Sequence, residues 1–100
     1  MEGELPSSER IQKVFLVGAM ESLLNAHQHG KATQMRIAVL TNKPRRTVLF
    51  RFTNNGALPA DRVQMGGGLA LVRAAAEDAK GSVRWIDHPE FTLEIELPLP

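Results

Sequence analysis

A strict alternation of apolar and polar residues in the segment 91–97 constrains the fold more than any other feature of the sequence. Its apolar members are Phe91, Leu93, Ile95 and Leu97, and its polar members are Thr92, Glu94 and Glu96. Because successive side chains of a strand point to opposite faces, this segment predicts a strand with one buried face and one face in water. The buried face of such a sheet needs a covering layer, so we expect helices on that side only and a two-layer α+β fold.

The rest of the chain supplies the elements for this arrangement. Helix-capping residues, glycines that end helices and runs of β-forming residues predict the elements. In the first half of the chain these are a helix from Ser8 to His29 and strands from Met35 to Thr41 and from Thr47 to Asn54. A loop from Asn55 to Gly67, a helix from Leu69 to Lys80 and strands from Val83 to Asp87 and from Phe91 to Leu97 follow. Gly30 and Gly81 follow the two helices directly, where glycine favours a left-handed stop. This order is that of an α+β sandwich.

Charge and composition exclude several classes of protein. The chain has 100 residues, 43% of them hydrophobic, and a formal net charge of +1. This size predicts one domain over residues 1–100, and the mixture of acidic and basic residues argues against a nucleic-acid partner. Cysteine is absent, and the apolar runs fall short of the roughly 20 residues that span a bilayer. We therefore expect no disulfides, no thiolate metal site, no membrane contact and a cytoplasmic location.

The first predicted helix carries a polar stripe on its apolar side. Glu21, Asn25 and His29 follow one another at intervals of four residues and project within about 80° of arc. The same side carries Ile11, Val14, Gly18 and Ser22. Polar groups on a buried face are costly when unpaired, so these three either bond to local backbone and to each other or meet a polar ligand or cation. The oxygen donors suit Mg²⁺, and a glutamate beside a held water suits a general base; the stripe alone favours neither interpretation.

A run of glycines opens the second predicted helix. The run is Gly66-Gly67-Gly68-Leu69. Glycines let a ligand approach the backbone closely, and the free amides and positive dipole end of a helix N-terminus favour an anion such as a phosphate. A flexible loop would use the same residues, so this motif alone is weak evidence. Asn54-Asn55-Gly56 is weaker still, because any turn would use it.

In combination and in this order, these segments resemble the nucleotide-binding boxes of one superfamily. Residues 21–30 resemble the N box of histidine kinases, Asn54-Asn55-Gly56 the box that meets adenine, and Gly66-Gly67-Gly68-Leu69 the glycine box over the phosphates. The ending Leu93 to Leu99 is similar to the last strand and its Leu-Pro finish. The superfamily is that of the GHKL ATPases, which includes gyrase, Hsp90 and MutL.

The resemblance implies a two-layer α/β sandwich of the histidine kinase, Hsp90 and gyrase type, with a mixed sheet and helices on one face. Nine residues, Ala57 to Met65, separate the two glycine boxes, which is similar to the short-lid subclass of kinases.

The resemblance also implies roles for individual residues. Asn25 would help to hold a Mg²⁺ ion that bridges the phosphates, and Glu21 would polarise or deprotonate the attacking group. The ATP would lie near His29, Gly30, Lys31, Asn54 and Gly56, and the backbone amides of Gly66, Gly67, Gly68 and Leu69 would meet its phosphates.

The sequence departs from the family pattern at several positions. Asn54 stands where the family has the aspartate that accepts a hydrogen bond from the adenine amino group, and Gln28 stands where a lysine or arginine is usual. Glu90-Phe91 stand in place of Gly-Thr before the last strand, and Ala70 replaces a common third glycine. These departures predict weakened nucleotide affinity and no change of fold.

The function implied is that of a catalytic domain that binds Mg-ATP and passes the γ-phosphoryl group to a histidine on the dimerisation domain of the same kinase, with a response regulator as the indirect partner. No segment resembles the helix hairpin that bears this histidine, so we expect a fragment of a larger kinase in which His27, His29 and His88 are not the acceptor. The alternative is a degenerate GHKL domain that acts as a nucleotide-binding regulator or a protein-interaction module without kinase activity. Glu21 with Asn25 favours nucleotide binding, and the departures favour the alternative.

Overall fold

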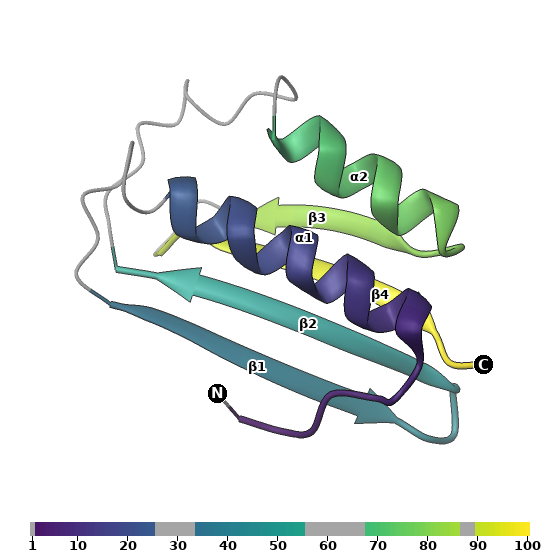
Figure 1. Cartoon of the computed structure of the whole chain (residues 1–100). Coiled ribbons are helices and arrows are strands. Elements are labelled where there is room, and N and C mark those ends of the chain that lie inside the picture. Colours follow the sequence, from purple (N-terminus) through teal and green to yellow (C-terminus); the bar gives the residue numbers. More distant parts are fainter. Residues whose placement is uncertain (1, 26–33, 56–67, 87–89) are drawn as a thin grey trace.

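Helices and strands follow the order expected from the sequence in the computed structural model, which describes residues 2–25, 34–55, 68–86 and 90–100 (Figure 1). The elements are α1 (Glu9–Asn25), β1 (Met35–Asn42), β2 (Thr47–Asn54), α2 (Gly68–Asp78), β3 (Ser82–Ile86) and β4 (Thr92–Pro98). The predicted end of the first helix, from Ala26 to His29, lies outside the described residues. The bounds of the other elements agree with the sequence prediction to within one or two residues. Neither α1 nor α2 is long and apolar enough to cross a membrane.

The four strands form one sheet in the order β1-β2-β4-β3, and every neighbouring pair is antiparallel. The expectation of a mixed sheet was therefore wrong for these strands. β2 and β3 run in the same direction and are connected through α2, but β4 lies between them and pairs with both. The connection through α2 would make β2 and β3 a parallel pair if they were neighbours, but they do not pair because β4 separates them. A parallel contact exists only as an isolated bridge between Glu2 and Ala38 within the described part of the chain.

Both helices cover the same face of the sheet, as the alternation in β4 predicts (Figure 1). The core between the layers consists of Ile11, Val14, Val39, Val48, Phe50, Phe52, Val72, Ala76, Ala79, Phe91, Leu93, Ile95 and Leu97. Gly18 allows α1 to lie directly on the sheet, because a Cβ at this position would stand 2.7 Å from Ile95 Cδ1 and 3.0 Å from Phe52 Cε2. The one-sided covering predicted from the sequence is confirmed.

The end of α2 differs from the prediction in which residue takes the left-handed conformation. Lys80 has a φ of 67°, whereas Gly81 does not have a positive φ. The Gly81 amide donates to the Ala76 carbonyl at 2.8 Å and the Lys80 amide to the Glu77 carbonyl at 2.9 Å, which is the Schellman pattern with Lys80 at the left-handed position. Gly81 is needed for a different reason: a Cβ there would overlap the Glu96 carbonyl oxygen and the Leu97 side chain.

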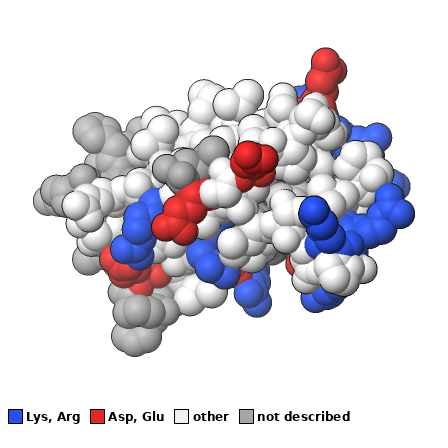
Figure 2. Space-filling view, turned by 90° about the horizontal axis from the view of Figure 1, so that it is seen from below, with Lys and Arg blue, Asp and Glu red and all other residues white. Residues whose placement is uncertain are grey.

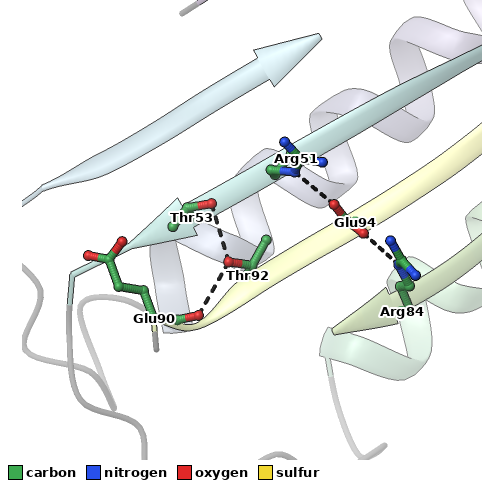
Figure 3. A network of polar contacts seen from close by, with 6 residues as sticks. All are labelled: Arg51, Thr53, Arg84, Glu90, Thr92 and Glu94. Carbon is green, nitrogen blue, oxygen red and sulfur yellow. Dashed lines mark hydrogen bonds and ion pairs between the residues drawn. The ribbon is translucent and has the colours of Figure 1, made fainter. Parts of the chain in front are cut away.

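The face of the sheet away from the helices is not uniformly wet, contrary to the expectation for Glu94. This side chain is 3% exposed. Its carboxylate accepts hydrogen bonds from Arg51 Nε at 2.7 Å and from Arg84 Nε at 2.5 Å, so the three residues form a row across β2, β4 and β3 (Figure 3). Burial alone would raise the pKa of Glu94, but the hydrogen bonds and charges of the two arginines outweigh it and lower the pKa below its ordinary value of 4.5.

Charges of both signs are mixed on the face of the molecule seen from below (Figure 2). Acidic and basic side chains lie next to one another over much of it, and basic ones gather at the end where the turn between β1 and β2 lies. This turn contains Lys43, Arg45 and Arg46. In the Arg51–Glu94–Arg84 row, one carboxylate pairs with two guanidinium groups.

We expect Glu94→Gln to lower the free energy of unfolding at pH 7 by about 1–2 kcal/mol, a value reduced because both arginines are partly exposed. The folded-state pKa is depressed, so the charged carboxylate stabilises the fold above pH 4.5 and this contribution is lost as the pH falls through the folded pKa. Urea unfolding of both proteins between pH 7 and pH 3 checks this. Glu96→Gln is the control, since Glu96 has no ion pair among the described residues. A difference between Glu94→Gln and the unmodified chain that is constant with pH would contradict the assignment.

Candidate functional site

The chain segments that carry the predicted site meet at one end of the molecule. α1 ends there at Asn25, β2 ends there at Asn54, and α2 begins there at Gly68 (Figure 1). This follows from the directions of the elements: α1 runs along the sheet in the direction of β2, and α2 runs back in the opposite direction. Groups that are up to 43 residues apart in the sequence are thereby brought to the same edge of the two layers.

The face of α1 that carries the polar stripe lies toward the sheet. Ile11, Val14, Gly18 and Ser22 are all buried, as the helical spacing predicts. Glu21 is partly exposed and lies at the border of this face. Asn25 is the last residue of α1, and its side chain is outside what the structure describes, as are His29, Gly30 and Lys31. The described part of the stripe thus runs from the core toward the end of the helix.

Asn54 closes β2 on the inner face of the sheet. Asn54 is 3% exposed and lies on the same strand face as Phe50 and Phe52, which is the inner face of the sheet. Its amide donates to the Phe91 carbonyl at 3.1 Å. The neighbouring Asn55 accepts a hydrogen bond from the Gln34 amide at its Oδ1, at 3.0 Å, and so fastens the end of β2 to the start of β1. Asn54 is therefore a buried residue at a strand end that hydrogen bonds fix to β1 and to the start of β4.

The start of α2 lies at the same end. The helix begins at Gly68, one residue before the predicted start, and the first-turn amides of a helix carry the positive end of its dipole. Gly56, Gly66 and Gly67 lie outside the described residues, and nothing is described of the surroundings of Gly68 and Leu69. An anion such as a phosphate suits this position electrostatically.

In the described ranges no three His, Cys, Asp or Glu residues come together in a group that could hold a metal ion. Glu21 and Asn25 supply oxygen atoms one helical turn apart. This fits Mg²⁺, which keeps several waters and takes few protein ligands together with phosphate oxygens.

Two of the departures from the family pattern have structural roles. Phe91 is a core residue with 2% exposure, and its carbonyl accepts the Asn54 amide. Glu90 forms an ion pair with Arg36 at 2.8 Å. Ala70 is exposed on α2, and Gln28 lies outside the described residues. Phe91 therefore fastens the start of β4 to the end of β2, and Glu90 links the segment before this start to β1.

The sequence prediction missed one polar group in this region. Ser22 was counted with the apolar side of α1, and its hydroxyl is buried with 2% exposure and no hydrogen-bond partner among the described residues. The available signal was its position, three residues before Asn25 and one turn after Gly18, on the side of the helix that faces the sheet.

Comparison with known proteins rests on structure. No protein-family model matches the sequence, and no curated protein matches it. Among solved structures, the chain is similar to the histidine kinase AdeS of Acinetobacter baumannii, with a TM-score of 0.69 and 17% identity over 90% of this chain and 46% of that one. It is similar to the histidine kinase domain of the blue-light-activated histidine kinase EL346 of Erythrobacter litoralis, with a TM-score of 0.73 and 17% identity over 91% of this chain and 45% of that one.

A third similar structure is a domain by itself. The ATP-binding domain of PrrB from Mycobacterium tuberculosis gives a TM-score of 0.71 and 24% identity, over 88% of this chain and 68% of that one. The chain spans less than half the length of the AdeS and EL346 structures that it matches. The similarity covers 88–91% of this chain, and the protein has the α+β fold of the ATP-binding domains of histidine kinases.

Proposed function

We propose that this protein is the ATP-binding catalytic domain of a sensor histidine kinase. It binds Mg-ATP at the end where α1 and β2 finish and α2 begins, and it passes the γ-phosphoryl group to a histidine on a separate dimerisation domain. The observation that carries the proposal is the meeting of the Glu21–Asn25 turn, the buried Asn54 and the start of α2 at one end of a fold shared with kinase ATP-binding domains.

Each residue of the proposed site has a part in positioning or charge stabilisation, which dominate phosphoryl transfer. Asn25 supplies an oxygen to Mg²⁺, and Glu21 acts on the attacking group from one helical turn away. Asn54 reads the base. The remaining contacts to the nucleotide come from His29, Gly30, Lys31, Gly56, Gly66, Gly67, Gly68 and Leu69.

An exposed apolar stripe on α1 suits the dimerisation domain as a partner. Leu16, Met20, Leu23 and Leu24 are 59%, 63%, 55% and 47% exposed. Their spacing places them on one side of the helix, opposite Ile11, Val14, Gly18 and Ser22. Large apolar side chains grouped on a surface mark contact sites, and this group lies on the half of α1 that leads to the proposed nucleotide site. A dimerisation domain bound to this stripe would bring its histidine close to the proposed nucleotide site.

The alternative function is a nucleotide-binding regulator or a protein-interaction module without kinase activity. It is favoured by Asn54, which offers a neutral amide where an ionised carboxylate would make stronger hydrogen bonds. Binding of ATP without transfer to any supplied histidine domain would identify the regulator, and absence of ATP binding would identify the interaction module.

We expect the chain alone, incubated with γ-labelled Mg-ATP, to acquire no acid-labile label on His27, His29 or His88. Joined to a histidine-bearing dimerisation domain, it should label that domain. Met20→Glu with Leu23→Glu should reduce this transfer at least tenfold and leave ATP affinity unchanged, because the stripe serves the partner. Leu40→Glu, at a 44% exposed apolar residue of β1, is the matched control and should change neither. Stoichiometric label on one of the three histidines would overturn the proposal.

A further inference from the structure

The hydroxyl of Ser22 needs an explanation that the fold does not give. Ser22 is 2% exposed, and its Oγ has no hydrogen-bond partner within the described residues. A buried polar group without a partner lowers stability, and such groups in a native protein commonly serve a ligand or a held water. A serine in a helix can also donate to the carbonyl four residues earlier, but no such bond is present here. The hydroxyl can therefore form a hydrogen bond with a bound ligand or a held water.

The packing of α1 on the sheet fixes where this hydroxyl lies. One turn earlier, Gly18 lies against Phe52 and Ile95, since a Cβ there would be 3.0 Å from Phe52 Cε2 and 2.7 Å from Ile95 Cδ1. Four residues of helix advance about 6 Å and two residues of strand about 6.6 Å. Because α1 and β2 run in the same direction (Figure 1), Ser22 and Asn54 lie at the same level, both on the buried side.

We propose that Ser22 is a base-reading residue of the nucleotide site, which hydrogen-bonds a purine base directly or through one held water. This inference rests on the proposed function. The hydroxyl lies on the buried side of α1, at the same level as the buried Asn54 at the end of β2, whereas the phosphates are expected at the outer end of α1 and the start of α2. A flat, largely apolar base with polar edges suits buried polar groups at the border of an apolar core.

The hydrogen-bonding groups of Ser22 and Asn54 determine which purine bases the site can bind. A hydroxyl and an amide each can donate and accept a hydrogen bond, whereas an ionised aspartate only accepts. Ser22 with Asn54 therefore accommodates a purine with a 6-amino group, which donates, and one with a 6-oxo group, which accepts. The chain should bind ATP and GTP with affinities within about tenfold of each other, which corresponds to about one hydrogen bond.

Calorimetric titration of Ser22→Ala with Mg-ATP, Mg-GTP and Mg-tripolyphosphate tests the proposal. Loss of one neutral hydrogen bond should weaken both nucleotides about fivefold and leave tripolyphosphate, which has no base, unchanged. Ser82→Ala, at an exposed serine of β3 on the other face, is the matched control and should change nothing. Thermal unfolding without ligand gives the second readout: Ser22→Ala should be as stable as the unmodified chain or more stable, because alanine removes an unpaired hydroxyl and favours the helix.

Unchanged ATP and GTP affinity in Ser22→Ala would overturn the role of Ser22 and leave the proposed function standing. An equal loss for tripolyphosphate would do the same, since the base is then not what Ser22 reads. A lower unfolding temperature of the unliganded variant would show a structural role and overturn the proposal whatever the binding results are. Absence of ATP binding by the unmodified chain is the separate outcome that defeats the proposed function, and the role of Ser22 falls with it.

Discussion

Asn25→Ala should abolish the Mg²⁺-dependent part of nucleotide binding and leave the fold intact. Asn25 is the last residue of α1, one turn beyond Glu21, at the end of the molecule where β2 finishes and α2 starts. Its amide oxygen is the proposed protein ligand of a cation whose other ligands are phosphates and water. Loss of a direct ligand should cost at least the roughly 10–100-fold in affinity that follows loss of a supporting partner of a metal ligand. Alanine retains the helix, because it is the best helix former.

Calorimetry with ATP, with and without Mg²⁺, measures this effect. Lys13→Ala, at an exposed residue near the start of the same helix, is the control and should keep the full Mg²⁺ dependence. Unchanged Mg²⁺ dependence in Asn25→Ala would remove Asn25 from the metal site. Loss of helical circular dichroism would instead show that Asn25 is a structural residue, the interpretation in which the stripe only bonds to local backbone.

Gly81→Ala should lower the free energy of unfolding by about 2–4 kcal/mol. The reason is contact with β4, not backbone conformation: the added Cβ would overlap the Glu96 carbonyl oxygen and the Leu97 side chain. A strand carbonyl is held by its neighbours and cannot move aside alone, so α2 must shift away from the sheet. At Gly18 the nearest atoms belong to the side chains of Ile95 and Phe52, which can adjust, and Gly18→Ala should cost about 1–3 kcal/mol.

Urea unfolding followed by the fluorescence of Trp85, the only tryptophan of the chain, gives these values. Lys80→Gly is the informative companion, because Lys80 has the positive φ and glycine adopts it without strain. This variant should be at least as stable as the unmodified chain. A Gly81→Ala variant within about 0.5 kcal/mol of the unmodified chain, the range of ordinary surface substitutions, would show that α2 does not approach β4 as described.

Local patterns were sufficient to predict the elements and the layers. The alternation in β4 and the helical spacing of Ile11, Val14 and Gly18 each depend on a single element facing a single core. The mixed sheet was wrong because pairing between β2 and β4 joins segments that are far apart in sequence, and no local pattern says which strand is inserted between β2 and β3. Glu94 was misjudged for a similar reason: its burial depends on arginines from two other strands.

In the site, too, local patterns predicted some features, and others depend on contacts between distant parts of the chain. Asn54 was predicted as the last residue of a strand, and the structure confirms this place. The position of Ser22 indicated a buried side chain, but only the three-dimensional structure shows that its hydroxyl has no hydrogen-bond partner among the described residues. The left-handed conformation at the end of α2 was assigned to Gly81 because glycine favours it, but Lys80 adopts it. Gly81 instead allows the close contact with β4, which no local pattern predicts.

We propose that this chain binds Mg-ATP at the end where α1, β2 and α2 meet. Isothermal titration of the unmodified protein with ATP, in the presence of Mg²⁺ and again with Mg²⁺ chelated, tests it most directly. We expect saturable one-to-one binding of ATP that weakens at least tenfold without Mg²⁺. No heat of binding in either condition, with the protein shown to be folded by its circular dichroism, would contradict it.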